Sequence, residues 1–216
     1  MLIDCALVKS KIPEATVKRL SLYLNCIAEV GNSNSRISSE KLAKLARVNP
    51  AQVRRDLSYL GSLGTRGVGY DLSTLKNQLN IVLGLVEGWS AIIVGAGNLG
   101  SALAQYEGFE DKGFGIVGLY DVDSKKVSTK VAGIVVKHIE KINDDIKKYK
   151  VAIGIITTPS EFAQDTANLL IAGGIKSILN FAPSRIESTD SGVVIKNVDL
   201  SQELQVLSYY LDEPLK

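Results

Sequence analysis

The sequence is poor in the residues that most often bind metals or form disulfides. Its 216 residues include one His and two Cys. The two cysteines, Cys5 and Cys26, have neither metal-ligand spacing nor a redox motif around them, so the sequence predicts no metal site and no disulfide framework. Two free thiols are typical of a reducing cytoplasm.

Long apolar segments are also missing. No apolar run reaches the length of a membrane span, and residues 1–11 lack the basic region, apolar stretch and cleavage site of a secretory leader. With 45% apolar residues, however, the chain can bury a core. We therefore predict a folded cytoplasmic protein without a membrane partner.

Charge of one sign does not dominate the chain, but the two signs are unevenly distributed. The formal net charge is +2. Residues 1–80 hold 12 Lys and Arg against 6 Asp and Glu, a net charge of +6, whereas residues 81–216 hold 13 against 17, a net charge of −4. This asymmetry predicts two modules with different partners.

The basic part has the apolar spacing of three helices. The first begins at Pro13 and ends before the Gly31–Ser35 segment. The second, residues 40–46, is capped by Ser38-Ser39, and the third has Asn49 as N-cap and Pro50 in its first turn. The predicted buried positions are Val17, Leu20, Leu24, Ile27 and Val30, then Leu42 and Leu45, then Val53, Leu57 and Leu60.

The short turn 47–49 joins the second and third helices as in a helix-turn-helix, whose second helix enters the DNA major groove. The glycine-rich segment 61–70, with Arg66, has the composition of a wing. The predicted DNA-facing residues are Gln52, Arg54, Arg55, Ser58, Tyr59 and Arg66. Arginine can pair with guanine through two hydrogen bonds, and the others can reach bases or phosphates. A solvated basic face without nucleic acid is the alternative.

Beyond an amphipathic stretch at 72–85, short apolar runs alternate with segments of helical length. The runs are 91–94, 116–120, 151–156 and 175–179. Such runs are typical of strands buried on both faces, and their alternation with helices predicts a parallel sheet.

A glycine motif follows the first of these runs. Gly95, Gly97 and Gly100, with Asn98 and Leu99 between them, match the dinucleotide-binding pattern GxGxxG. In that pattern the glycines allow a tight turn, a close approach to the pyrophosphate and close packing of the next helix. Asp121, at the end of the next strand, would accept hydrogen bonds from the ribose diol and repel a 2′-phosphate, so NAD(H) is favoured over NADP(H). Glycines that serve only a tight turn are the alternative.

Two more strand ends point to the same crevice. The residues that would flank the nicotinamide there are Thr158, Pro159, Phe181 and Pro183, although Phe181 also fits a purely packing role. No acid or base for hydride chemistry accompanies them, because the only histidine, His138, lies outside these loops and no Tyr-x-x-x-Lys pair adjoins them. We infer that NAD(H) is sensed and not consumed, and that the chain is not an enzyme.

The last predicted helix, 198–211, is apolar on more than one face. Leu200, Leu204, Leu207 and Leu211 form one stripe, and Val206, Tyr209 and Tyr210 lie beyond it. A helix of this kind requires burial on several sides. The sequence predicts a subunit contact; a terminal helix docked on its own domain is the alternative.

With these features the sequence resembles the Rex family of redox-sensing transcriptional repressors almost from end to end. The matching stretches are 12–13, 19–20, 38–39, 54–59, 64–70, 94–100, 180–183 and 197–200. The resemblance implies a homodimer that represses fermentation and respiration genes when NAD+ dominates and leaves DNA when NADH rises. It also implies a C-terminal helix exchanged between subunits.

The resemblance further assigns roles to single residues. It places Arg54 and Arg55 on the recognition helix and Arg66 in the wing. Tyr106 and Asp199 match positions of a hydrogen-bond switch beside the nicotinamide, which makes them cofactor-binding candidates. The basic partner of that switch in the family corresponds to Asn25 here, and an uncharged amide cannot form the ion pair.

Taken together, the sequence predicts an α/β protein with three parts. Residues 1–80 form a winged helix-turn-helix domain for double-stranded, palindromic operator DNA. Residues 81–198 form a Rossmann-type parallel-sheet domain with NAD(H) as regulatory ligand, and residues 199–216 form the exchanged helix. The alternatives are a small NAD-dependent dehydrogenase and a coenzyme A-binding module.

Overall fold

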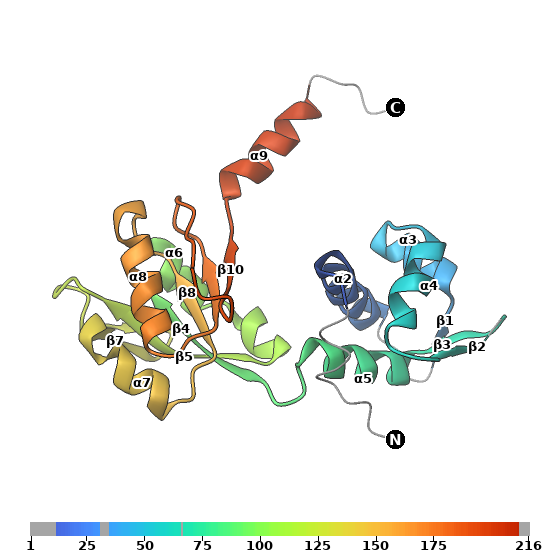
Figure 1. Cartoon of the computed structure of the whole chain (residues 1–216), viewed down its shortest axis with the longest axis horizontal. Coiled ribbons are helices and arrows are strands. Elements are labelled where there is room, and N and C mark those ends of the chain that lie inside the picture. The colour runs from blue at the N-terminus through green and yellow to red at the C-terminus, as the bar shows by residue number, and fades with distance from the viewer. Residues whose placement is uncertain (1–11, 31–34, 66, 212–216) are drawn as a thin grey trace. The chain divides into compact units, whose positions relative to one another are not determined.

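The computed structural model describes residues 12–30, 35–65 and 67–211. The chain divides into two compact units, Met1–Glu87 and Gly88–Lys216 (Figure 1). Among the described residues, no helix has both the length and the apolar character needed to cross a membrane. Arg66 and Cys5 lie outside the described residues.

In its described residues, the first unit combines four helices with a small antiparallel sheet. The helices are α2 (Glu14–Val30), α3 (Ser39–Ala46), α4 (Pro50–Ser58) and α5 (Leu72–Leu83). The strands β1 (Arg36–Ile37), β2 (Gly64–Thr65) and β3 (Gly69–Asp71) pair in the order β1-β3-β2. The predicted caps are present, because Ser38 accepts a hydrogen bond from the Lys41 N–H and Asn49 accepts one from the Ala51 N–H. The β2–β3 hairpin forms the predicted wing.

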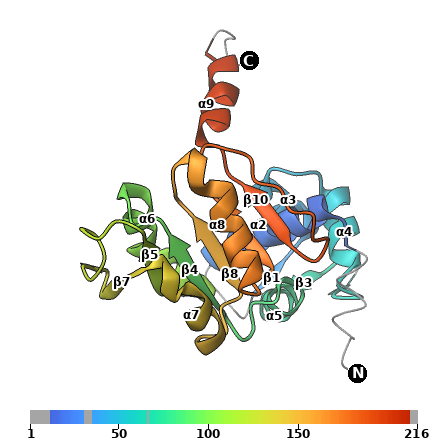
Figure 2. The same ribbon diagram turned by 60° about the vertical axis from the view of Figure 1, so that its left-hand side comes forward.

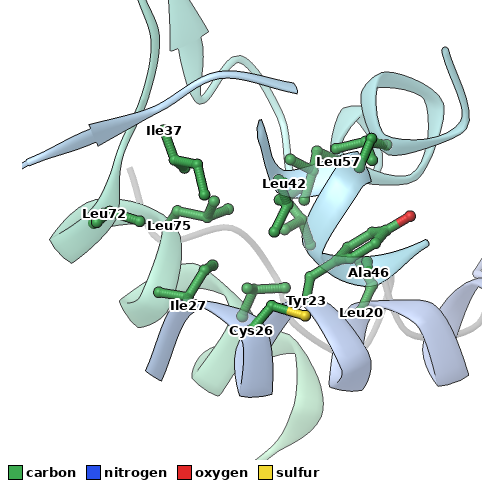
Figure 3. Close-up of a cluster of buried hydrophobic side chains, with 14 residues drawn as sticks. Leu20, Tyr23, Cys26, Ile27, Ile37, Leu42, Ala46, Leu57, Leu72 and Leu75 are labelled. Atoms are coloured by element: carbon green, nitrogen blue, oxygen red, sulfur yellow. The ribbon is translucent and has the colours of Figure 1, made fainter. Parts of the chain in front are cut away.

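The core of this unit lies between α2, α3, α4 and α5 (Figure 3). Two predicted core positions are wrong, since Val17 is 39% and Leu45 is 41% exposed. On α2 the buried face runs through Leu20, Tyr23 and Ile27, which turns Val17 toward solvent. On α3 the small residues Ala43 and Ala46 are buried beside Leu42, so Leu45 lies at the edge of the buried face.

The second unit is built on a seven-stranded sheet of order β10-β9-β8-β4-β5-β7-β6, in which every pairing except β6–β7 is parallel. The strands are β4 (Trp89–Val94), β5 (Phe114–Asp121), β6 (Lys130–Val131), β7 (Ile134–His138), β8 (Ile153–Ile156), β9 (Ser177–Asn180) and β10 (Val194–Asn197). The four predicted runs correspond to β4, β5, β8 and β9. Strands β6, β7 and β10 were not predicted, because β6 has two residues and the apolar runs 134–136 in β7 and 193–195 at β10 are shorter than those of the central strands.

Helices cover both faces of this sheet. Helices α7 (Ile142–Lys148) and α8 (Ser160–Ala172) pack with one set of strand side chains, and α6 (Asn98–Ala104) packs with the other. Two short 3-10 helices, η1 (Glu107–Lys112) and η2 (Ile139–Lys141), complete the unit. Strand β4 lies between β5 and β8, so the chain changes direction across the sheet at β4. Ligands of open parallel sheets bind beyond such a switch point.

Helix α9 (Leu200–Tyr209) follows β10 directly and has no buried residue. Figure 2 shows it extending away from the sheet. The exposed fractions of the predicted stripe are 60% for Leu200, 67% for Leu204, 61% for Leu207 and 84% for Leu211. The alternative in which this helix docks on its own domain is therefore wrong for the described chain.

Candidate dinucleotide and nucleic-acid sites

A pocket of about 730 Å³ lies beyond the carboxyl ends of β4, β5, β8 and β9. Eight of the predicted cofactor residues line it: Gly95, Gly97, Leu99, Asp121, Thr158, Pro159, Phe181 and Pro183. The pocket also contains residues that sequence reasoning missed, among them Val122, Lys126, Ile139, Phe162 and Leu169. Most of these come from the segment after β5 and from α8, which carry no recognisable motif.

The three motif glycines have different geometric reasons to be glycine. Gly95 has φ +106, and a Cβ there would lie 2.8 Å from the carbonyl carbon of Thr157. A Cβ at Gly100 would overlap the carbonyl oxygen of Gly95. A Cβ at Gly97 would meet no atom within 4 Å, so this backbone borders open space. Gly95 and Gly100 are therefore required by the packing of the chain itself, while Gly97 leaves room for a ligand.

Asp121 is the last residue of β5, and three hydrogen bonds fix the orientation of its carboxylate. Its Oδ2 accepts hydrogen bonds from the Ala96 N–H at 2.8 Å and from Lys126 Nζ at 2.9 Å, and its Oδ1 accepts one from the Asp123 N–H at 2.9 Å. Burial raises the pKa of this carboxyl, but these three donors lower it by more, so the net pKa lies below its usual value. Asp121 is therefore an ionised acceptor, preorganised at the mouth of the glycine loop.

Thr158 has a side-chain oxygen that is buried and, within the described part of the chain, has no hydrogen-bond partner. A buried hydroxyl without a partner is energetically unfavourable unless a ligand supplies one. Because Thr158 lines the pocket together with the open backbone at Gly97 and the Asp121 carboxylate, the residues present fit a polar ligand with an apolar body.

Four predicted cofactor residues do not line this pocket. Asn98 and Gly100 belong to the first turn of α6. Tyr106 is 57% exposed and borders a separate pocket of about 500 Å³, with its ring in edge contact with Phe109. Asp199 is the N-cap of α9, where its Oδ1 accepts a hydrogen bond from the Ser201 N–H at 2.9 Å. Their roles toward a cofactor stay predictions.

The predicted DNA-facing side of α4 is mostly exposed. Arg54, Arg55, Ser58 and Tyr59 are accessible to solvent. A groove of about 690 Å³ runs between α4, the start of α3 and the β2–β3 hairpin. Arg54 borders it and donates through Nη1 to Ser39 Oγ at 2.9 Å and to Glu40 Oε1 at 3.2 Å, which leaves its other guanidinium nitrogens available to a partner.

Gln52 has a hydrogen-bond partner within α4, and its role toward DNA stays a prediction. It is half-buried, and its Nε2 donates a hydrogen bond of 2.8 Å to Asp56 Oδ1. Gln52 lies one turn before Asp56 on α4, so its amide can reach the buried carboxylate of Asp56 along the helix. Arg54 and Arg55 are exposed instead.

Sequence reasoning missed the structural role of Asp56 in this unit. It is fully buried. It accepts hydrogen bonds from Arg19 Nε at 2.6 Å, from Arg19 Nη2 at 2.8 Å, from the Tyr23 hydroxyl at 2.8 Å and from the Thr16 hydroxyl at 3.2 Å. Burial raises its pKa, but the donors, led by Arg19, lower it by more. Asp56 therefore joins the recognition helix to α2. An acidic residue between Val53, Leu57 and Leu60 was the available signal.

Two protein families match separate parts of the chain. The family described as CoA binding domain matches residues 86–184, and the family described as putative DNA-binding protein N-terminus matches residues 11–58. The second match covers α2, α3 and α4. The first covers the glycine loop and the strands that surround the pocket.

Longer matches come from individual proteins. The redox-sensing transcriptional repressor Rex of Streptomyces griseus is 49% identical over 200 residues, which cover 92% of this chain and 79% of the relative. The Rex of Desulforamulus reducens is 43% identical over 202 residues, which cover 93% of this chain and 96% of the relative.

Solved structures agree with these relatives. RSP, a Rex-family repressor, has been solved with β-NAD+ and operator DNA, with a TM-score of 0.87 and 37% identity over 94% of this chain and 93% of RSP. Its structure with β-NADH has a TM-score of 0.84 and 36% identity over 94% of this chain and 95% of RSP. Since relatives of this similarity match both units over more than nine-tenths of the chain, it belongs to the Rex family of redox-sensing transcriptional repressors.

Proposed function

We propose that this chain is a cytoplasmic, homodimeric repressor that binds palindromic operator DNA through α4 and the β2–β3 hairpin and binds NAD(H) in the pocket beyond β4. The observation that carries the proposal is its similarity, over both units, to a repressor solved with NAD+ and operator DNA and also with NADH. Membership in a family of repressors removes the dehydrogenase alternative.

On the DNA side, Arg54 and Arg55 supply the main positive charge of α4. Arg54 is the candidate for a base contact, because Ser39 and Glu40 hold only its Nη1 and the remaining donors match the two acceptors of a guanine edge. Arg55, Ser58 and Tyr59 are suited to phosphates and neighbouring bases. Arg66 would add a wing contact.

On the cofactor side, each wall of the pocket has a separate role. Gly97 allows the backbone to approach the pyrophosphate, and Asp121 accepts hydrogen bonds from the adenosine ribose. Thr158 lines the pocket beside Pro159, Phe181 and Pro183, which supply apolar surface. When bound, the cofactor supplies a nicotinamide ring that is cationic in NAD+ and neutral in NADH. An apolar wall favours the neutral ring, because burying an unpaired charge costs free energy.

NADH is expected to weaken operator binding by at least about tenfold, since a ligand shifts a conformational equilibrium only by its differential affinity for the two states. The measurement is fluorescence anisotropy on a palindromic duplex that has been enriched from a random pool on the NAD+-loaded protein. Equal operator affinity with and without saturating NADH would contradict the sensing role. As a control, Arg54→Glu should lose operator binding and retain NADH binding.

The match to a CoA binding domain keeps coenzyme A as a second candidate ligand for the pocket. The adenosine of coenzyme A carries a 3′-phosphate on its ribose. The Asp121 carboxylate would repel this negative group. Calorimetry should therefore show NADH binding and much weaker coenzyme A binding. Tighter binding of coenzyme A would replace the redox proposal.

The dimer proposal depends on the exposed leucine stripe of α9. Burying a leucine stabilises an interface by about 2 kcal/mol, and a buried, unpaired carboxylate costs more. Leu204→Asp is therefore expected to raise the dimer dissociation constant at least about 100-fold, measured by sedimentation equilibrium. Gln205→Asp adds the same charge on the polar face of α9 and should leave the dimer intact. A dimer unaffected by Leu204→Asp would place the subunit contact elsewhere.

A further inference from the structure

The segment after β9 forms one wall of the dinucleotide pocket. Phe181 and Pro183 line the pocket from this segment. The segment continues to Ile186, which is 2% exposed and packs in the core beneath the sheet. A ligand in the pocket thus touches a short stretch of chain that is anchored at both ends.

Asn180, the last residue of β9, anchors the first end. It is fully buried, and both ends of its amide are used. Its Oδ1 accepts a hydrogen bond from the Ala182 N–H at 2.9 Å, and its Nδ2 donates to the Ser184 carbonyl oxygen at 2.7 Å. The same Nδ2 donates to Asn197 Oδ1 at 2.8 Å. The amide therefore holds the backbone on both sides of Phe181 and Pro183.

Asn197, the last residue of β10, anchors the second end. Its Oδ1 accepts a hydrogen bond from the Ile186 N–H at 3.1 Å, and its Nδ2 donates to the Ile186 carbonyl oxygen at 3.4 Å. It lies opposite Asn180 in the parallel register, and the next residue, Val198, donates its N–H to the Asn180 carbonyl oxygen at 2.8 Å. We call the Asn180–Asn197 pair the amide clasp.

The amide clasp joins the pocket wall to the start of α9. Only Val198 and Asp199 separate Asn197 from Leu200, the first residue of α9. Two residues are too few for an independent flexible linker, so a movement of the end of β10 is passed to the helix. Asn180 is fully buried, so breaking its bonds to Ser184 and Asn197 would leave its amide unpaired in the core, which is costly.

We propose that the amide clasp couples occupancy of the dinucleotide pocket to α9, with Asn197 as the positioning residue of that coupling. The inference rests on the proposed function and adds the route by which the cofactor acts on the subunit contact. A cofactor that displaces Phe181 or Pro183 strains the bonds to Asn180, and Asn197 passes that displacement to β10. The side chain of Asn197 hydrogen-bonds Asn180 and Ile186, which lie outside the glycine loop, so the cofactor can bind without it.

The test replaces Asn197 by Ala. Asn197 is exposed, so the variant should fold. Two quantities are measured on the full chain: the NADH dissociation constant without DNA, and the coupling factor, defined as the operator dissociation constant at saturating NADH divided by that without NADH. We expect Asn197→Ala to keep the NADH dissociation constant within about threefold and to lower the coupling factor at least about fivefold.

Two further variants separate this role from general weakening of β10. Val194 lies at the other end of β10 and is 57% exposed. Val194→Ala should leave the NADH dissociation constant and the coupling factor unchanged. Asn197→Asp retains the acceptor oxygen for Asn180 and Ile186 and should keep more of the coupling than Asn197→Ala. Equal losses in the two Asn197 variants would contradict the role of that oxygen.

The outcomes distinguish this inference from the proposed function. If the unmodified chain shows no effect of NADH on operator binding, the proposed function fails and the coupling route fails with it. If the unmodified chain responds and Asn197→Ala responds equally, only the amide clasp is overturned. Loss of NADH binding itself in Asn197→Ala would also overturn it, because Asn197 would then shape the pocket and not couple it.

Discussion

Replacing Arg19 by Met is expected to destabilise the first unit by about 3 kcal/mol and to abolish operator binding. Arg19 supplies two of the hydrogen bonds to Asp56, which is fully buried. Without the guanidinium, the Asp56 carboxylate stays in the core with only neutral donors from Tyr23, Thr16 and Gln52. Breaking a buried ion pair by removing one partner is costly because the remaining charge is not compensated. Thermal and urea unfolding of the full chain, monitored on both units, measures the loss.

The matched control for this variant is Lys18→Met, which removes the same charge from the adjacent residue. Lys18 pairs with Glu14 on the surface, where the two side chains are 71% and 65% exposed. Such pairs contribute little, so the control should lose less than about 0.5 kcal/mol and keep operator binding. NADH binding should survive in both variants, because Arg19 and Lys18 belong to the first unit. Equal stability of the two variants would show that Asp56 does not depend on Arg19.

The same pair predicts a pH dependence. The pKa of Asp56 is lowered in the folded chain, so its contribution to stability is fully present above its unfolded pKa of about 3.9. That contribution is lost as the pH falls below this value and through the folded pKa. In Arg19→Met the pKa of Asp56 is lowered less. The stability of the first unit should therefore depend less on pH below about pH 4.

Replacing Gly100 by Ala is expected to weaken NADH binding at least about 30-fold and to lower the stability of the second unit. The new Cβ would overlap the Gly95 carbonyl oxygen and would lie 2.8 Å from Thr157 Oγ1. Thr157 cannot easily move, because its Oγ1 donates to the Gly95 carbonyl oxygen at 2.8 Å. The glycine loop must therefore shift, and overpacking of this kind costs about 1–3 kcal/mol. Calorimetry with NADH and thermal unfolding measure the two effects.

Two other glycines make this prediction specific. Gly115→Ala is the control, since a Cβ there meets no atom within 4 Å and Gly115 does not line the dinucleotide pocket. Gly97→Ala also meets nothing in the chain, so it should leave stability unchanged and still weaken NADH binding, because its methyl group would occupy the space next to the pyrophosphate. Unchanged NADH affinity in Gly100→Ala would contradict the proposed position of the cofactor.

Much of the fold could be predicted from local patterns. The caps at Ser38 and Asn49 and the four central strands follow from residue types and spacing that act within a few positions along the chain. In the glycine loop, the positive φ of Gly95 and the contact between a Gly100 Cβ and the Gly95 carbonyl oxygen are local, whereas the contact of a Gly95 Cβ with Thr157 is not. Strands β6 and β10 escaped prediction, because β6 has two residues and the apolar run 193–195 at β10 has only three.

The candidate sites were less predictable wherever a side chain depends on a distant partner. Asp56 and Arg19 are 37 positions apart, so the place of Asp56 on the apolar face of α4 could indicate its burial but not its partner. The bond from Gln52 to Asp56 could not be predicted for the same reason, and the role of Gln52 toward DNA stays a prediction. Lys126 was missed because its role is defined by contact with Asp121 and not by a motif.

The sequence by itself determined the two-module organisation, the helix-turn-helix, the parallel sheet and the dinucleotide loop, because each is indicated by residue types and spacing within short stretches of chain. Only the tertiary structure decided that Asp56 joins α4 to α2 and that Asn180 and Asn197 join the wall of the pocket to the end of β10. These features depend on hydrogen bonds between residues far apart in sequence. Asp56 and Asn180 are both fully buried, so water does not compete for their hydrogen bonds in the folded chain.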